Sequence, residues 1–116
     1  MNKEQLQMLL MAKPDLFDGL KHHDQFMDWY PGNMHVINAF GRYAHQLQKS
    51  GRRDYYSCYA IRERIRWDSM VSEEGTEYKI SNNVTPYIAR ILMAFSPELD
   101  GIFRTKEQRS EDQEET

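Results

Sequence analysis

The apolar spacing of residues 34–49 is the feature that most constrains the fold. Ile37, Phe40, Ala44 and Leu47 recur at intervals of three and four, which places them on one face of an α-helix. Gly51 follows this segment and is a typical helix stop. Such a helix gains most of its stability by packing its apolar face, so the chain is expected to form a helical bundle.

Four further helices are predicted, over residues 2–13, 16–29, 57–71 and 85–95. The last is clearly delimited, because Thr85 and Pro86 form a typical start and Pro97 closes the segment. The second is the least regular, because Gly19 lies inside it and glycine disfavours helix.

The helix over residues 57–71 has two apolar sides. Ile61 and Ile65 lie on one, whereas Ala60, Trp67 and Val71 lie on the other. This pattern predicts a central helix that packs on two neighbours and leaves an arginine edge for solvent or a ligand.

Two short segments, residues 78–80 and 102–104, have the alternation of extended chain and are expected to pair. The predicted fold is therefore mostly α: a compact bundle of four to five helices with a minor two-stranded β element. This order of elements is compatible with a winged-helix variant. Residues 1–105 are expected to form a single helical domain, and residues 106–116 a disordered acidic tail, because the tail has no apolar residue to bury.

Charge is unevenly distributed along a chain whose net charge is −3. Residues 41–67 contain seven arginines and lysines against two acids, whereas residues 107–116 contain five acids against one arginine. This asymmetry indicates a polyanionic partner. A solvated helix face with a solubilising tail explains it equally well.

Several kinds of site are not expected. A single cysteine, Cys58, excludes an internal disulfide, and its place beside Ile61 favours a buried side chain over a nucleophile. His22 and His23 point about 100° apart on a helix, so they do not form a metal site together. We therefore predict no catalytic residue, no metal and no cofactor, and we do not expect an enzyme. With no signal peptide and no apolar run long enough for a membrane span, the cytoplasm is the expected compartment.

The basic residues of the middle segment suggest nucleic-acid binding. Arginine makes bidentate contacts to phosphates and guanine edges, and nearby tyrosines supply stacking surfaces. The alternative is structural: the arginines pair with acids or rings, and Asn82 and Asn83 cap and turn the chain. The predicted nucleic-acid-binding residues are Arg52, Arg53, Arg62, Arg66, Lys79, Asn82, Asn83 and Arg104.

Four motifs resemble those of small uncharacterised proteins encoded by bacteriophages and prophages. They are RERIRW at residues 62–67, YKISNN at 78–83, YIAR at 87–90 and FRT at 103–105. The resemblance covers roughly residues 26–106 and implies a bacterial cell or a phage-infected host. It implies no particular activity.

Two main hypotheses for the function remain open. The first is a small non-enzymatic DNA-binding or regulatory protein that uses the basic arginine-rich helix on double-stranded DNA. The second is a module that binds and inhibits or adapts a host protein, and a structural virion part is a third. A DNA reader is expected to place Arg62, Arg66 and Arg104 on one contiguous positive surface, whereas a protein-binding module is expected to expose an apolar patch. The oligomeric state is left open.

Overall fold

The fold is built around two helices, α3 (Met34–Ser50) and α5 (Thr85–Phe95). The structure is a computed structural model that describes residues 1–72 and 78–104. The predicted acidic tail lies outside the described residues. Ile37, Phe40 and Ala44 on α3 are fully buried, which confirms the apolar face predicted for this helix. Gly51 ends α3 in the left-handed conformation, at φ 61°, which glycine adopts readily.

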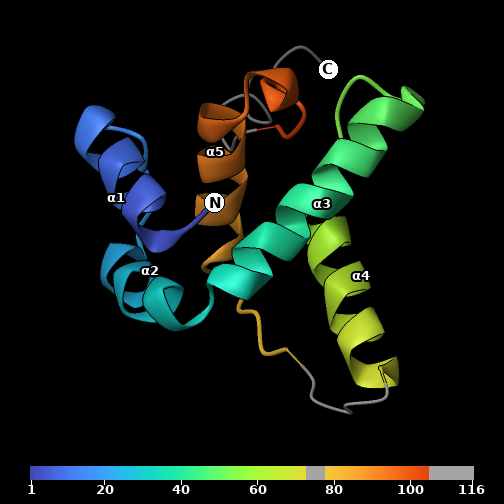
Figure 1. The fold of residues 1–116 in the computed structure, drawn as a ribbon, viewed down its shortest axis with the longest axis horizontal. Helices are drawn as coiled ribbons and strands as arrows, with labels where there is room; N and C mark the ends of the chain where they lie inside the picture. Colours follow the sequence, from blue (N-terminus) through green and yellow to red (C-terminus); the bar gives the residue numbers. More distant parts are fainter. Residues whose placement is uncertain (73–77, 105–116) are drawn as a thin grey trace.

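Five α-helices are present in the described part of the chain, so the mostly helical fold class is confirmed. α1 is Lys3–Ala12, α2 is His23–Trp29 and α4 is Cys58–Val71, while η1 (Tyr30–Gly32) and η2 (Pro97–Leu99) are short 3-10 turns. Figure 1 shows α5 in the middle of the molecule, with α1 and α2 on one side and the long α3 running diagonally to α4 on the other.

An aromatic cluster joins α2 to α5. The Phe26 ring stacks on Tyr87 with centroids 5.0 Å apart, and Phe17 meets Tyr87 edge-on at 4.7 Å. Such ring pairs contribute beyond the area that they bury. The Tyr87 hydroxyl also accepts a hydrogen bond of 2.8 Å from the backbone N–H of His22. Tyr87 therefore holds both α2 and the segment before it.

The second predicted helix is shorter than expected. Residues 14–19 form successive turns, and α2 begins only at His23. Gly19 has φ 83°, a left-handed conformation incompatible with a continuing right-handed helix. The prediction of one helix over residues 16–29 was therefore wrong in its first half.

The predicted pairing of residues 78–80 with 102–104 is also wrong, and the described residues contain no strand. Phe103 instead forms an isolated parallel bridge with Tyr56, whose N–H donates to the Ile102 carbonyl at 2.7 Å. Backbone groups of residues 78–80 form hydrogen bonds with side chains of α4 instead of with another strand. Arg62 Nε donates to the Ile80 carbonyl, and the Tyr78 N–H donates to Ser69 Oγ. A winged-helix variant needs a β wing, so that part of the prediction is not supported.

α4 packs through one face rather than two. Ile61 and Ile65 are buried as predicted. Trp67 is 60% exposed and Val71 is 62% exposed, so the second apolar side has no neighbour in the described structure. α3 and α5 already cover the opposite face of α4, and no described element lies beyond it.

Two isoleucines test this arrangement of the core. Ile61→Ala and Ile91→Ala are each expected to lower the free energy of unfolding by about 2–5 kcal/mol, because truncating a buried aliphatic side chain loses packing and leaves a cavity. Denaturant unfolding measures the change. Met11→Ala is the control, because Met11 is 84% exposed and its truncation should be nearly neutral. Unchanged midpoints for both isoleucine variants would contradict the helix faces described above.

Candidate nucleic-acid interface

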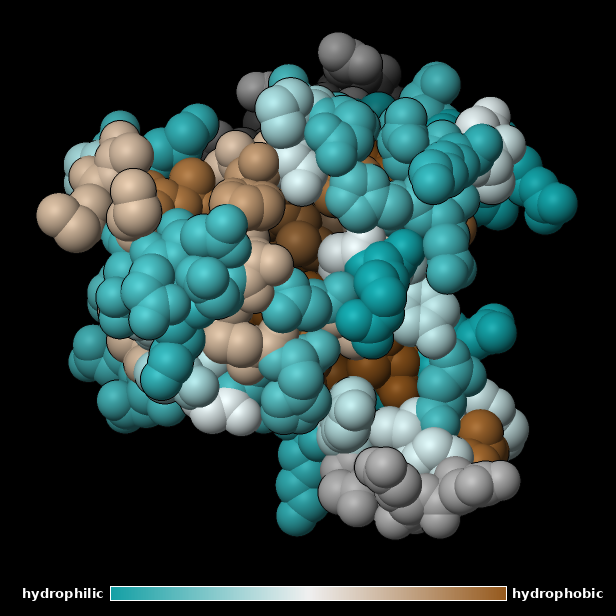
Figure 2. Space-filling view, in the orientation of Figure 1, coloured by the Kyte–Doolittle hydropathy of each residue, from teal (hydrophilic) through white to brown (hydrophobic). Residues whose placement is uncertain are grey.

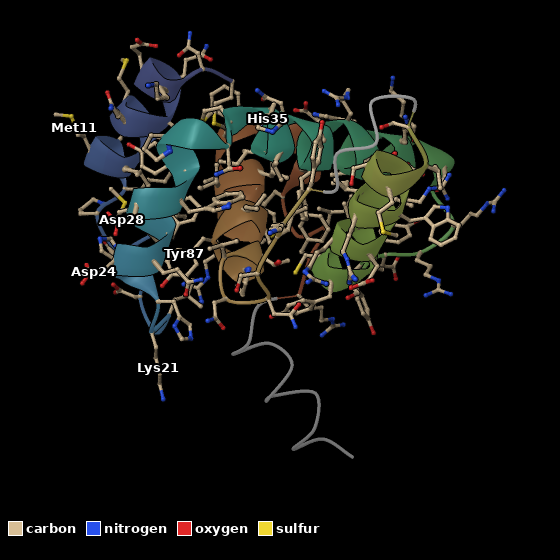
Figure 3. All side chains as sticks on the ribbon, turned by 90° about the horizontal axis from the view of Figure 1, so that it is seen from below. Met11, Lys21, Asp24, Asp28, His35 and Tyr87 are labelled. Atoms are coloured by element: carbon tan, nitrogen blue, oxygen red, sulfur yellow. The ribbon has the colours of Figure 1, made fainter. Side chains whose placement is uncertain are left out.

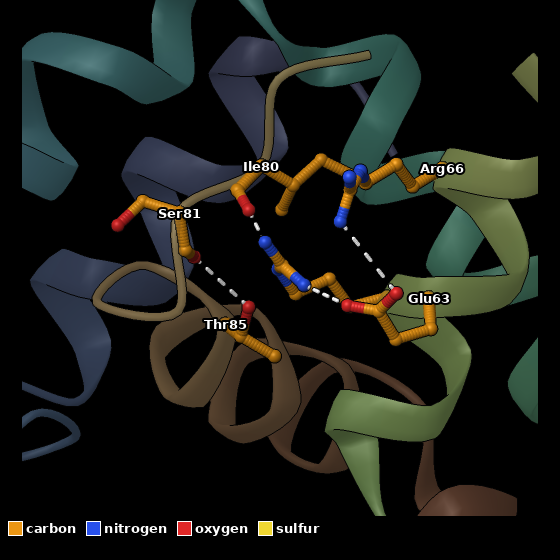
Figure 4. A network of polar contacts seen from close by, with 6 residues as sticks. Glu63, Arg66, Ile80, Ser81 and Thr85 are labelled. Atoms are coloured by element: carbon orange, nitrogen blue, oxygen red, sulfur yellow. Dashed lines mark hydrogen bonds and ion pairs between the residues drawn. The ribbon is translucent and has the colours of Figure 1, made fainter. Parts of the chain in front are cut away.

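Arg62 is a structural residue rather than a free cation. Its Nε donates a hydrogen bond of 2.6 Å to the Ile80 carbonyl, and its Nη1 pairs with Glu63. Only 15% of the side chain is exposed. Figure 4 shows the contact at the Ile80 carbonyl as a dashed line, with Glu63 and Arg66 of α4 nearby. Arg62 therefore ties the segment before α5 to α4.

The other arginines of α4 also contact acids. Glu63 lies 3.7 Å from Arg66, and Asp68 lies 3.2 Å from Arg64. The Arg66 side chain is 42% exposed, so it still reaches solvent beside its partner. The structural alternative stated for these arginines thus accounts for Arg62 and Arg64 and for part of Arg66.

The two asparagines before α5 differ. Asn83 donates from Nδ2 to Gln25 Oε1 at 3.1 Å, and its N–H donates to Ser81 Oγ at 3.0 Å. Asn83 therefore turns the chain and connects it to α2. The side chain of Asn82 is exposed and makes no hydrogen bond within residues 1–72 and 78–104, so both edges of its amide remain available.

Two hollows adjoin the segment 78–83. The first, which we call the Asn82 cleft, has a volume of about 320 Å³ and lies between residues 19–22, the first turn of α4, α5 and Arg104. The second, the Lys79 groove, has a volume of about 380 Å³ and lies between Trp29, α4 and residues 78–81. Ile80 and Ser81 line the groove, and the next two residues, Asn82 and Asn83, line the cleft. The two hollows therefore border one continuous segment of the chain.

The predicted residues are divided among three places. Arg62, Arg66 and Lys79 line the Lys79 groove, and Asn82, Asn83 and Arg104 line the Asn82 cleft. Arg52 and Arg53 lie in the exposed loop after α3, which Figure 1 places at the far end of α3 from residues 78–83. The eight residues therefore do not form one contiguous site.

Arg104 is positioned by an aromatic ring. Its guanidinium carbon lies 3.9 Å from the centre of the Tyr55 ring, within the range of a cation–π interaction. Tyr55 precedes the bridge between Tyr56 and Phe103, so this bridge brings Arg104 back to the start of α4. That contact explains how a residue near the end of the described chain comes to line the cleft.

Two cleft residues, Lys21 and Arg90, were not among the predicted site residues, whereas Tyr59 is one of the tyrosines expected to supply a stacking surface. Arg90 Nη1 donates to the carbonyls of Leu16 and Asp18, at 3.0 and 2.6 Å, and so fastens the turns before α2 to α5. These contacts join residues more than 70 positions apart in the sequence, so no local sequence pattern predicts them. In Figure 3, Lys21 projects from the chain just before α2.

A hydrogen bond between α3 and α4 shifts the pKa values of both of its partners. Tyr43 donates its hydroxyl to Asp68. This bond and the neighbouring Arg64 hold the pKa of Asp68 below its usual value, against the opposing effect of desolvation. The same bond, desolvation and the charge of Asp68 raise the pKa of Tyr43. The pair is therefore strongest when the carboxylate is ionised and the phenol is protonated.

Within the described residues, no group of three or more histidine, cysteine, aspartate or glutamate side chains is placed to hold a metal ion. Cys58 is buried. None of the described helices combines the length and apolar character needed to cross a membrane.

Comparisons with known proteins give no match: no protein-family model, no curated protein and no solved structure resembles this chain significantly.

The two arginines that were predicted to act together are expected to differ. Arg62→Ala should lower the free energy of unfolding by about 1.5–3 kcal/mol, because it removes a charge-assisted hydrogen bond and leaves the Ile80 carbonyl without it. Arg66→Ala, the matched control one turn away, should cost about 0–1 kcal/mol, as exposed ion pairs do. Denaturant unfolding compares them, and equal losses would contradict a structural role specific to Arg62.

The Tyr43–Asp68 bond predicts a pH dependence. A lowered carboxyl pKa stabilises the fold above the ordinary aspartate value of about 3.9, and this contribution disappears as the pH falls through the lowered value. A raised phenol pKa gives stability that is present below about pH 10 and lost as the pH rises through the raised value. Tyr43→Phe should therefore be less stable than the parent between these limits and should approach it in acid.

Chemical denaturation at a series of pH values measures this difference. Tyr55→Phe is the control, because the Tyr55 hydroxyl makes no hydrogen bond in the described structure. A stability gap between Tyr43→Phe and the parent that persists unchanged below both carboxyl pKa values would contradict the ionic character of the bond.

Proposed function

We propose that this protein is a non-enzymatic, nucleic-acid-binding protein whose contact surface consists of the Asn82 cleft and the Lys79 groove. One observation carries the proposal: among residues 1–72 and 78–104, no carboxylate lines either hollow. Cations line both hollows instead, and the amides of Asn82 and Asn83 line the cleft. A local excess of positive groups on an acidic protein favours a polyanionic partner.

A third hollow of the described structure has a different charge. It lies on the other side of Arg90 and is lined by Asp15, Asp18 and Asp100 together with Lys13. The acids of α2 also lie away from Tyr87, which lines the Asn82 cleft. Figure 3 shows Asp24 and Asp28 along the opposite edge of α2. Glu63 is the nearest exception, since it pairs with Arg66 at the groove.

The surface differs from the one predicted from sequence. Lys79 and Arg66 supply cations at the groove, and Lys21 and Arg104 supply them at the cleft. Arg62 holds the surface in shape rather than contacting the ligand. In this proposal lysines and arginines bind phosphates, which positions the nucleic acid without specifying its sequence. We propose binding rather than catalysis, because Glu63, the carboxylate beside Arg66, is held in ion pairs with Arg62 and Arg66.

We also propose that it acts as a small DNA-binding regulator in a bacterial or infected cell, and the four motifs that resemble phage-encoded proteins support this proposal. Double-stranded DNA remains the proposed partner for the groove. The phage origin stays a prediction from the four sequence motifs.

A second candidate function, binding to a host protein, is favoured by the exposed edge of α4. Trp67, Met70 and Val71 lie at spacings of three and one, on one side of the last two turns, and all are exposed. Exposed tryptophan is frequent where proteins bind each other. Figure 2 shows a strongly apolar spot in the region of the C-terminal end of α4 and a separate, less apolar area over α1.

The test of nucleic-acid binding is fluorescence anisotropy with labelled duplex DNA over a salt series. Binding is expected to weaken with salt, because each neutralised phosphate releases counterions. Lys79→Ala with Arg66→Ala should weaken binding and flatten the log–log salt slope by about 0.9 for each phosphate contact removed. Lys3→Ala with Lys13→Ala is the control, because it removes the same charge from the region of α1.

Two results would contradict the proposal. Either the parent fails to bind nucleic acid at low salt, or the α1 control loses as much affinity as the groove variant. In the first case, capture of proteins from a nuclease-treated bacterial lysate by the parent, and its loss in Trp67→Ala, would favour the host-protein alternative.

A further inference from the structure

The Asn82 cleft has the size and lining of a site for a single small ligand. Its volume of about 320 Å³ lies near the lower end of the roughly 300–1,000 Å³ of small-molecule sites. The groove beside it is more open to solvent, and its lining includes Trp29, Tyr78 and three cations. The cleft is therefore suited to one small molecule or one residue of a polymer, rather than to the continuous backbone of a nucleic acid.

The walls of the cleft are held by contacts within the fold. Arg90 binds the carbonyls of Leu16 and Asp18, and the His22 N–H binds the Tyr87 hydroxyl, so residues 16–22 are fastened to α5 from two sides. Asn83 fastens the opposite wall to α2 through Gln25. A site whose walls are fixed before binding loses little conformational freedom when a ligand enters.

The chemistry inside the cleft changes from apolar to cationic. Leu20, Pro86, Ala89 and Met93 provide apolar surface, and Tyr59 provides an aromatic ring. Apolar and aromatic groups suit the flat faces of a heteroaromatic ring, which a bare phosphate does not have. The lining therefore favours a ligand with an aromatic part.

Polar groups at the cleft match the remaining parts of a nucleotide. The exposed amide of Asn82 offers both a donor and an acceptor, as base edges require. Lys21 and Arg104 are cations at the same cleft, and the side chain of Lys21 makes no ion pair within the described residues. α4 also directs its N-terminal end, the positive end of the helix dipole, toward the cleft at Cys58.

We infer that the Asn82 cleft binds one nucleotide, with an unpaired base between Tyr59 and Asn82 and its phosphate at Lys21 and Arg104. The inference rests on the proposed function and deepens it, because it adds a site for a single unpaired base to a surface that binds nucleic-acid backbone. A base inside a duplex is inaccessible to such a cleft, so the nucleotide belongs to a single strand or is free in solution.

Amide NMR shifts of the full chain test the inference. The probes are adenosine monophosphate, cytidine monophosphate, a short single-stranded oligonucleotide and inorganic phosphate. We expect the nucleotides and the oligonucleotide to shift the amides of residues 19–22, 58–59 and 82–90, and inorganic phosphate to shift them much less. Tighter binding of the oligonucleotide identifies a strand as the source, and equal affinity identifies the free nucleotide.

Two variants and two matched controls assign the contacts. Asn82→Ala and Lys21→Ala should each weaken nucleotide binding by about tenfold, the effect of losing one hydrogen bond or ion pair of ordinary strength. Gln46→Ala and Lys3→Ala remove an exposed amide and an exposed cation elsewhere and should leave affinity unchanged. Asn82 and Lys21 are exposed, so melting temperatures should change little and the variants remain folded.

Three results would overturn the inference: no shifts at the cleft with any nucleotide probe, equal shifts with inorganic phosphate, or unchanged affinity in both Asn82→Ala and Lys21→Ala. Any of these three results, found together with duplex binding that depends on Lys79 and Arg66, would refute the nucleotide site alone and leave the proposed function standing. Absence of binding to duplex, strand and nucleotide would refute both.

Discussion

The hydrogen bond from Arg62 to the Ile80 carbonyl determines where residues 78–81 lie before the start of α5. The bond is short, at 2.6 Å, largely shielded from water, and made by a charged donor, which strengthens it relative to neutral hydrogen bonds. It holds residues 78–81 against α4 and leaves Asn82 and Asn83 to turn into α5. Both hollows of the candidate surface border this segment, so their shape depends on the bond.

A second set of contacts has the same role on the opposite wall. Arg90 and Tyr87 project from successive turns of α5 and bind backbone groups of residues 16–22. Backbone groups in irregular segments must find partners when they are withdrawn from water. Here side chains of the central helix supply those partners, and as a result a segment without helix or strand becomes a fixed wall.

The charges of α4 show why a basic pattern alone does not identify a binding surface. Arg62, Arg64 and Arg66 lie on one helix, yet each has a different environment: a buried carbonyl, an acid one turn away and a partly exposed ion pair. An exposed ion pair costs little to break, so Arg66 is available to a phosphate. Arg62 is not, because its loss would leave a carbonyl unsatisfied. The cations best suited to bind a phosphate are those that make no contact required for the fold, such as Lys21 and Lys79.

Helices and their apolar faces were largely determined by the sequence. The spacing of Ile37, Phe40 and Ala44, the glycine after α3 and the proline at the start of α5 act over one or two turns, and each was predicted with nearly the observed bounds. The sequence also identified Asn82, Asn83, Lys79 and Arg104 as candidates, although not how they are grouped. These are local signals, which sequence carries directly.

Only the tertiary structure decided which residues share a surface. The break at Gly19, the bridge of Tyr56 to Phe103 and the exposure of Trp67 depend on what lies opposite each segment. Lys21 lies at the cleft because the neighbouring His22 binds Tyr87, 65 residues away. Arg62 lines the groove, but its guanidinium is held by the Ile80 carbonyl. The physical reason is that hydrogen bonds and ring contacts between distant residues have no periodicity along the chain, whereas helical faces do.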